Sequence, residues 1–210
     1  MIYSQQAETE KLIYRFMWGE LPLFACEQWL QEPETISQLP EKLQIAMKDL
    51  DLSDLNSMQR RQEIERLFDI VVDPRQFQTW LLLELLPLVM HEDPRACLAL
   101  AQISELYQDG LHFLQIMELA FQSGAGAAHF DWNRVRDAVP HLKPVCRLLI
   151  QALSNGEITM NQSGVNVSND LAGLLVQKKD WRQANHEILR WEQAQNQLIP
   201  SSLGLTAPTE

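Results

Sequence analysis

The tripeptide Asp-Pro-Arg occurs twice, at residues 73–75 and 93–95, and limits what the chain can fold into more than any other feature. In each copy the Asp side chain can accept hydrogen bonds from the first turn of a helix, and the proline lacks an N–H group that this position leaves unpaired. Both copies therefore predict helix starts. Residues 80–90, between the two, are apolar on every side except at Glu84, so we expect a helix that runs through the middle of the fold and bends near Pro87.

Apolar residues recur at helical spacing through most of the remaining chain. The one stretch typical of β-structure is residues 158–167, where two short apolar runs flank Asn-Gln-Ser-Gly. The fold class is therefore all-α, mainly antiparallel helical hairpins that stack as a solenoid or close into a bundle, with one small β-hairpin. Together with the apolar helix, the expected helices cover residues 7–18, 23–31, 40–47, 57–72, 94–110, 111–122, 131–139, 144–153, 168–176 and 180–198.

Domain organisation is inferred from where the flexible residues lie. Residues 123–128, Ser-Gly-Ala-Gly-Ala-Ala, are the most flexible part of the interior sequence. We therefore expect a single helical domain over residues 1–199, in which a subdivision near 124–130 stays open, followed by a flexible tail over residues 200–210. With 210 residues, the chain can bury a substantial core in either arrangement.

Cysteine usage and the N-terminal sequence indicate a cytoplasmic protein. Cys26, Cys97 and Cys146 are odd in number, far apart and embedded in apolar sequence, which is typical of free thiols in a reducing compartment. Residues 1–12 lack the basic start and apolar run of a secretory signal. The longest apolar stretch, residues 80–90, falls far short of the roughly 20 residues that cross a bilayer. No membrane association is expected.

The sequence contains no recognisable catalytic, cofactor-binding or metal-binding motif. Its five histidines have none of the spacings that would set metal ligands on one helical face or in one tight turn. Residues 124–129, Gly-Ala-Gly-Ala-Ala-His, resemble the start of a dinucleotide-binding loop but have histidine in place of the third glycine and no preceding strand. We therefore predict a protein that is not an enzyme and takes no cofactor and no metal; a catalytic carboxylate pair that assembles only in space stays open.

Direct nucleic-acid binding is not expected either. The net charge of −11 opposes contact with a phosphate backbone, which requires clustered lysines and arginines. The hairpin at residues 158–167 is similar in placement to the wing of a winged-helix DNA reader, but the nearby Lys178, Lys179 and Arg182 are offset by carboxylates. The six tryptophans lack interleaved basic residues and are interpreted as core or interface residues.

Negative charge is concentrated near the N-terminus. Residues 1–54 contain ten carboxylates and four lysines or arginines, a net charge of −6 out of −11. They either provide solubility alone or form an acidic patch that speeds encounter with a basic protein. Six of these carboxylates fall in or beside predicted turns, where side chains can meet a partner, and these are the candidate binding residues: Glu32, Glu34, Glu41, Asp49, Asp51 and Asp54.

Two segments of the N-terminal quarter carry a recognisable pattern. Residues 16–30 read Phe-Met-Trp-Gly-Glu-Leu-Pro-Leu-Phe-Ala-Cys-Glu-Gln-Trp-Leu, and residues 50–54 read Leu-Asp-Leu-Ser-Asp. Together they resemble an N-terminal pattern in small immunity proteins of bacterial contact-dependent-inhibition and related polymorphic toxin systems. Cys26 stands where that pattern usually has an aromatic residue. The matching positions are Phe16, Gly19, Glu20, Glu27, Trp29, Leu30 and residues 49–54.

This resemblance implies a non-enzymatic protein that binds one cognate toxin, often a nuclease, in the cytoplasm of the producing cell. Our leading hypothesis is an immunity protein that neutralises a basic, nuclease-like toxin by occluding its active site or an essential surface with the acidic patch. The alternative is a helical adaptor or scaffold for an endogenous cytoplasmic protein, which the apolar helix at residues 80–90 would serve equally well. A helical enzyme is the third class.

Overall fold

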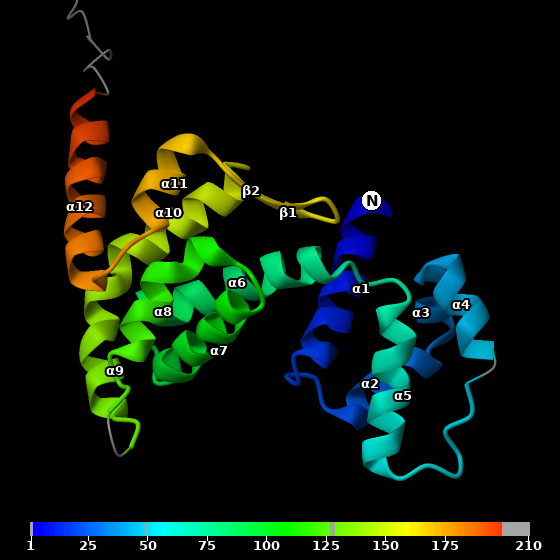
Figure 1. Ribbon diagram of the computed structural model, residues 1–210. Helices are drawn as coiled ribbons and strands as arrows, with labels where there is room; N and C mark the ends of the chain where they lie inside the picture. The colour runs from blue at the N-terminus through cyan, green and yellow to red at the C-terminus, as the bar shows by residue number, and fades with distance from the viewer. Residues whose placement is uncertain (1, 49, 127–128, 199–210) are drawn as a thin grey trace, which may run out of the picture. The chain divides into compact units, whose positions relative to one another are not determined.

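The computed structural model describes residues 2–48, 50–126 and 129–198, and these residues are mainly helical (Figure 1). Among them, one two-stranded antiparallel sheet is the only β-sheet. The predicted fold class, all-α with one small β-hairpin, is confirmed. Within the same ranges, every helix is too short or too polar to cross a membrane. The predicted tail at residues 200–210 lies outside the described residues.

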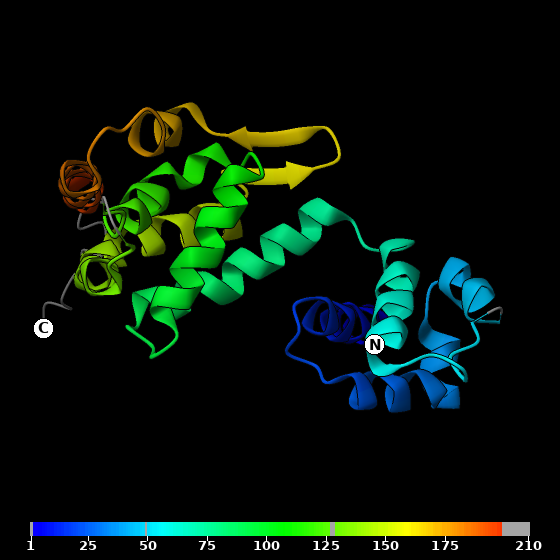
Figure 2. The ribbon, with the colours of Figure 1, turned by 60° about the horizontal axis from the view of Figure 1, so that its bottom comes forward.

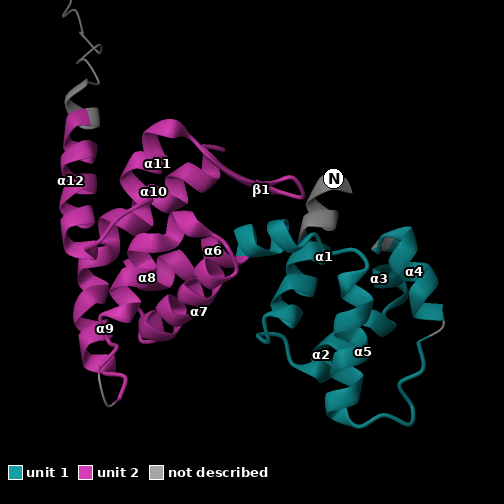
Figure 3. Cartoon of the chain, viewed as in Figure 1, with its two compact units in different colours: residues 1–80 teal, residues 81–210 magenta. Residues whose placement is uncertain are grey.

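The chain forms two compact units, residues 1–80 (unit 1) and residues 81–210 (unit 2), shown in Figure 3. The division falls within helix α6 (Pro74–Met90), whereas the sequence favoured one helical domain and left open a subdivision near residues 124–130. Residues 124–126 lie inside unit 2, where Gly124 is buried. The flexible composition of that segment therefore marks a loop within a unit and not a boundary between units.

Local signals begin or end several helices of unit 1. Gly19 adopts a positive φ of +86°, the backbone conformation that commonly ends a helix, two residues after the end of α1. Asn56 accepts a hydrogen bond from the Gln59 backbone, and the Gln59 side chain accepts one from the Asn56 backbone, which starts α5. No helix is predicted between residues 31 and 40, but Pro33 starts the short helix α3, because its fixed φ suits a first turn. The helices before α6 are α1 (Ile2–Met17), α2 (Leu23–Gln31), α3 (Pro33–Gln38), α4 (Glu41–Lys48) and α5 (Ser57–Asp69).

A hydrophobic core holds the helices of unit 1 together. Phe16 of α1 and Phe68 of α5 are fully buried and meet edge to face, with their ring centroids 5.6 Å apart. Cys26 of α2, Leu43 of α4 and Ile64 of α5 are buried in the same cluster. Full burial of each large apolar side chain stabilises the unit by about 1.5–3 kcal/mol. The core therefore sets the positions of α2, α4 and α5, which carry the candidate site.

Unit 2 contains the rest of α6 and all later elements. The prediction of a buried apolar helix is confirmed, because Leu82, Leu85, Leu86 and Val89 of α6 are fully buried. Asp73 and Asp93 each accept a hydrogen bond at 2.8 Å from the backbone two residues on. After the first tripeptide the helix begins at Pro74, as expected, whereas after the second it begins only at Ala96, with Arg95 at its N-cap, so Pro94 is not a helical residue. The helical elements after α6 are α7 (Ala96–Gln108), η1 (His112–Leu114), α8 (Gln115–Gln122), α9 (Trp132–Ala138), η2 (Val139–Leu142), α10 (Lys143–Ser154), α11 (Asn169–Leu175) and α12 (Trp181–Leu198).

The predicted hairpin consists of β1 (Ile158–Asn161) and β2 (Gly164–Val167), seen as two arrows in Figure 2. Ile158 pairs with Val167, and Asn161 pairs with Gly164 across a two-residue turn. Ile158 and Met160 are buried while Thr159 and Asn161, which alternate with them, are exposed, and β1 contacts α10. The strand thus buries one face, which stabilises a hairpin that would be marginal alone.

Candidate functional site

Three of the predicted binding carboxylates stand at helix starts in unit 1. Glu32 directly precedes α3, Glu34 lies in the first turn of α3, and Glu41 is the first residue of α4. Negative charge at a helix N-terminus is favourable by about 0.3–1 kcal/mol, so each has a structural role as well. All three side chains are nevertheless exposed. They are therefore accessible to a partner.

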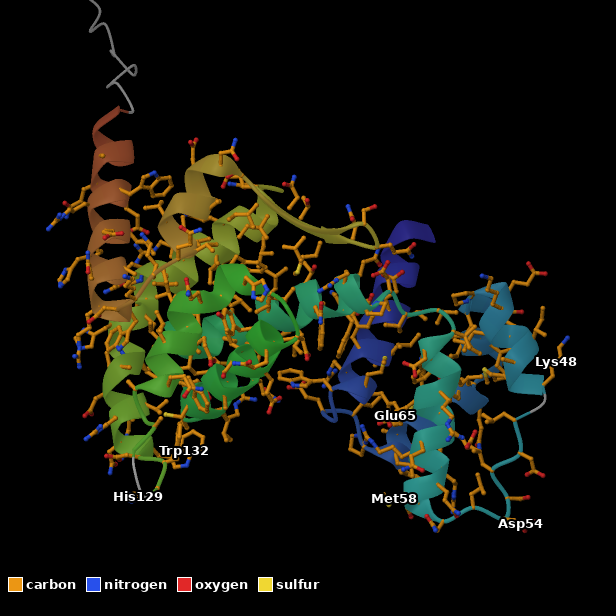
Figure 4. The ribbon with its side chains drawn as sticks, viewed as in Figure 1. Lys48, Asp54, Met58, Glu65, His129 and Trp132 are labelled. Carbon is orange, nitrogen blue, oxygen red and sulfur yellow. The ribbon has the colours of Figure 1, made fainter. Side chains whose placement is uncertain are left out.

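The other predicted carboxylates belong to the connection between α4 and α5. Asp51 and Asp54 are exposed there, and Figure 4 labels Asp54 close to the start of α5. The Asp51 carboxylate accepts hydrogen bonds from the Ser53 hydroxyl at 2.6 Å and from the Ser53 backbone at 3.0 Å. These two bonds hold the pKa of Asp51 below its ordinary value, and the bond from the hydroxyl has the larger effect. Asp51 is therefore ionised at neutral pH. Asp49 lies outside the described residues.

The five described carboxylates lack compensation by nearby bases. None of them forms an ion pair with another described residue, and we call the five together the acidic surface. By contrast, Glu8, Glu20 and Glu27 form ion pairs, with Lys11 at 3.1 Å, Arg15 at 3.5 Å and Arg60 at 3.3 Å. The fold therefore pairs several carboxylates of the N-terminal quarter with bases and leaves the five described ones between residues 32 and 54 without an ion pair. The members of the acidic surface are Glu32, Glu34, Glu41, Asp51 and Asp54.

An open pocket of about 420 Å³ lies among α2, α4, the connection after α4, and α5. Its volume is near the lower end of the range for small-molecule sites. Half of its lining side chains are apolar, and Leu30, Leu50, Leu52 and Met47 also pack against the core of unit 1. The pocket wall is thus anchored by the core. The lining residues are Glu27, Leu30, Gln31, Met47, Leu50, Leu52, Ser53 and Arg60.

The charged end of this pocket is formed by Glu27 and Arg60. Arg60 donates from Nη1 to Glu27 Oε1 at 3.3 Å and from Nε to the Leu55 carbonyl at 3.0 Å. The side chains are 17% exposed for Glu27 and 37% for Arg60, so solvent screens the ion pair and limits it to about 1 kcal/mol or less. Its larger effect is positional, because Arg60 ties the α4–α5 connection to α2.

None of the five members of the acidic surface lines this pocket. Three of them directly precede or follow a lining residue in the chain: Glu32 follows Gln31, Asp51 lies between Leu50 and Leu52, and Asp54 follows Ser53. Glu34 and Glu41 belong to α3 and α4 and have no lining residue as a neighbour in the chain.

Sequence reasoning missed the pocket itself. Of residues 49–54, the sequence singles out the carboxylates, but Leu50 and Leu52 pack against the core of unit 1, and these two leucines were the available signal. Arg60 belongs to the helix predicted over residues 57–72, where the sequence assigns it no role. Its partner Glu27 is 33 residues away in the chain, so the local pattern could not reveal the pair.

The glycine-rich loop of unit 2 is explained by packing. A Cβ atom on Gly124 would lie 2.7 Å from a Val135 methyl and 2.8 Å from the Phe130 ring. Phe130 in turn contacts Phe121 and Trp132, with ring centroids 4.9 Å and 5.0 Å apart. The element before this loop is the helix α8 and not a strand. The loop therefore lacks the setting of a dinucleotide-binding site.

One carboxylate in the described part of the chain is buried, and its partners are neutral. Glu118 of α8 accepts hydrogen bonds from Ser104 of α7, from Gln108 at 2.9 Å and from Gln122 at 3.0 Å. These bonds join α7 to α8. No group of three or more histidine, cysteine or acidic side chains placed to hold a metal ion occurs among the described residues.

Comparison of the chain with protein-family models, curated proteins and solved structures found no match.

Proposed function

We propose that the protein is a cytoplasmic immunity protein that binds and neutralises a cognate bacterial toxin through the acidic surface of unit 1. The toxin surface would be basic, as in a nuclease that holds a phosphate backbone. Binding of the acidic surface there would block the access of nucleic acid to the toxin. The immunity protein itself carries out no reaction in this proposal.

The observation that carries the proposal is the set of five exposed carboxylates without ion pairs, in the same unit as an open pocket with apolar walls. Protein interfaces combine a desolvated apolar centre with a polar rim, and charge complementarity sets the rate of encounter. Unit 1 offers both components. The resemblance of residues 16–30 and 50–54 to immunity proteins points to the same unit.

The proposal predicts that a toxin domain is encoded next to this gene, and that domain is the partner used in the test; the absence of such a gene would contradict the proposal. Purified toxin and immunity protein are combined at micromolar concentration, and complex formation is measured together with toxin activity. We expect a stable complex and loss of toxin activity. A variant with five lysine substitutions should neither form the complex nor inhibit the toxin, while keeping its helical circular dichroism spectrum. The substitutions are Glu32→Lys, Glu34→Lys, Glu41→Lys, Asp51→Lys and Asp54→Lys.

Unit 2 supplies a matched control with the same change in net charge. Each residue of the control is exposed and forms no ion pair with a described residue. We expect this variant to bind and protect as the wild type does. Equal loss in both variants, or full protection by the unit 1 variant, would contradict the role of the acidic surface. The control substitutions are Glu84→Lys, Glu105→Lys, Asp109→Lys, Asp137→Lys and Glu157→Lys.

A helical adaptor is the second candidate, and exposed apolar side chains on unit 2 favour it. Leu98 of α7 is 62% exposed, and Trp132 of α9 is 46% exposed. Large exposed side chains of this kind are common at protein interfaces. An adaptor would bind an endogenous protein through Leu98 or Trp132, so Leu98→Ser and Trp132→Ser would abolish that binding. In an immunity protein that acts through unit 1, these substitutions would leave toxin neutralisation unchanged.

A further inference from the structure

The pocket of unit 1 combines two chemistries that suit a long cationic side chain. Leu30, Met47, Leu50 and Leu52 supply apolar walls, while a carboxylate stands at one end. Arginine and lysine bury their aliphatic stems on apolar surface and keep the charged head with polar partners. A purely apolar ligand would leave the carboxylate without a partner, and a purely polar one would leave the leucines exposed.

The carboxylate end has unused capacity to accept hydrogen bonds. Glu27 receives one hydrogen bond within the described structure, that from Arg60 to Oε1, and its Oε2 receives none. Gln31 lines the pocket and its side chain forms no hydrogen bond with a described residue. The Ser53 hydroxyl donates to Asp51, and its oxygen can still accept. The lining therefore includes several acceptors with unused capacity, whereas the donors of Arg60 are partly used by Glu27 and the Leu55 carbonyl.

The charge around the pocket also selects a cation. Arg60 is the only cationic side chain among the lining residues, and Glu27 compensates it. The unpaired carboxylates Asp51 and Glu32 adjoin lining residues, so the surroundings carry excess negative charge. A guanidinium group can make several hydrogen bonds in one plane to acceptors placed side by side, which an ammonium group does less well.

We infer that this pocket receives an arginine side chain from the basic surface of the partner protein. The aliphatic part of that side chain packs on Leu30, Met47 and Leu52, and its guanidinium group binds the Glu27 carboxylate beside Arg60. This inference rests on the proposed function, since it names the residue of the toxin that the same surface anchors. Buried arginine residues are among the commonest hot spots of interfaces.

The pocket is tested with peptides, without any toxin. The full chain, methyl-labelled at leucine and methionine, is titrated with acetyl-Gly-Arg-Gly-amide and with the same peptide carrying citrulline, which is neutral and nearly isosteric. We expect the arginine peptide to shift the methyl signals of Leu30, Met47, Leu50 and Leu52 and to bind about tenfold more tightly than the citrulline peptide, because a charge-assisted bond is lost. Equal shifts by both peptides, stronger shifts by leucine or glutamate peptides, or no shift at these methyls would overturn the inference.

Two variants locate the bound side chain. Glu27→Gln removes the charge, so arginine and citrulline peptides should bind equally. Ser53→Phe places a ring at the pocket without altering a core residue, and it should abolish the shifts. Ser57→Phe is the matched control, because Ser57 is exposed in the same unit but does not line the pocket. Shifts that persist in the Ser53→Phe variant would place the peptide elsewhere and overturn the inference.

The outcomes separate this inference from the proposed function. Peptide binding at the pocket without binding of the neighbouring toxin would refute the immunity function and leave the arginine pocket standing. Toxin binding that depends on the acidic surface but is unchanged by Ser53→Phe would overturn the pocket and leave the function standing.

Discussion

Units 1 and 2 have similar net charges, −6 and −5, but they distribute their carboxylates differently. Residues 1–80 contain 14 carboxylates and 8 lysines or arginines, and residues 81–210 contain 14 and 9. Among the described residues, each unit has five ion pairs. In unit 1 the five members of the acidic surface lie within a short stretch of the chain, between residues 32 and 54. In unit 2 the exposed carboxylates that form no ion pair with a described residue are spread from Glu84 to Asp180.

Net charge therefore does not identify a binding surface in this chain. The two units are nearly equal in charge, but in unit 1 three carboxylates without ion pairs, Glu32, Asp51 and Asp54, directly adjoin in the chain residues that line an open pocket with apolar walls. Unit 2 even buries one carboxylate, Glu118, and uses it to join two helices. In unit 1 the five carboxylates of the acidic surface are exposed, and none of them joins two helices by hydrogen bonds. Removing Glu118 should therefore lower the stability of the fold, whereas removing a carboxylate of the acidic surface should weaken toxin binding.

The largest expected effect on stability is at Glu118. Replacing it with alanine leaves Ser104, Gln108 and Gln122 without their acceptor and opens a cavity, so the free energy of unfolding should fall by about 3 kcal/mol. Glu34→Ala, in the acidic surface, removes only a favourable charge in the first turn of α3 and should lower it by no more than about 1 kcal/mol. Urea unfolding followed by circular dichroism measures both. Similar losses of unfolding free energy in the Glu118 and Glu34 variants would contradict the view that Glu118 supports the fold and Glu34 does not.

Glycine substitutions should separate packing in unit 2 from backbone conformation in unit 1. Gly124→Ala pushes a Cβ atom into Val135 and Phe130 and should destabilise by about 1–3 kcal/mol, whereas Gly19→Ala strains a residue at positive φ by about 1–2 kcal/mol. Asparagine should affect the two sites differently. It tolerates positive φ, so Gly19→Asn should destabilise the protein less than Gly19→Ala. At Gly124 the larger side chain should make Gly124→Asn more destabilising than Gly124→Ala. Melting temperatures of the four variants give the order, and the same order at both sites would contradict the distinction.

The buried thiols should make both units sensitive to alkaline pH in the same way. Burial raises the pKa of Cys26 in unit 1 and of Cys146 in unit 2 to about 12, from an ordinary value of 9.0. Above pH 9 the unfolded chain loses protons that the folded chain keeps, so stability is full below pH 9 and falls as pH rises, by up to about 1.4 kcal/mol per pH unit for each thiol.

Urea unfolding between pH 8 and pH 10 checks this expectation on the wild type and on Cys26→Ala and Cys146→Ala. Each substitution should reduce the slope of unfolding free energy against pH above pH 9. The slope below pH 9 should stay unchanged. A slope that neither substitution alters would show that other groups dominate the alkaline response.

Most of the fold could be predicted because its signals are local. Gly19, the Asp73 and Asp93 tripeptides and the Asn161–Gly164 turn each act on residues within one or two turns, and the sequence shows them directly. The helix α3 was missed because Pro33 can both end one helix and start the next. The division at residue 80 was missed because it lies inside an apolar helix, where no composition change marks it.

The candidate site was predictable only in part. The six carboxylates could be chosen from their position beside turns, and the five described ones are exposed. The pocket could not be foreseen, because it depends on Arg60 reaching Glu27 across 33 residues and on Leu50 and Leu52 folding back onto the core. Contacts of this kind are determined by tertiary packing, which leaves little trace in a single sequence.

The central claim is that the acidic surface of unit 1 recruits a basic toxin, and the association rate tests it most directly. The rate of association with the toxin domain is measured by stopped flow over a range of ionic strengths. The proteins compared are the wild type, the unit 1 variant with five lysine substitutions and the matched unit 2 variant. The unit 1 variant should associate on the order of 10²-fold more slowly at low salt and lose most of its salt dependence, while the unit 2 variant stays close to the wild type. Equal slowing of both variants, or a salt dependence unchanged by the unit 1 substitutions, would contradict the account.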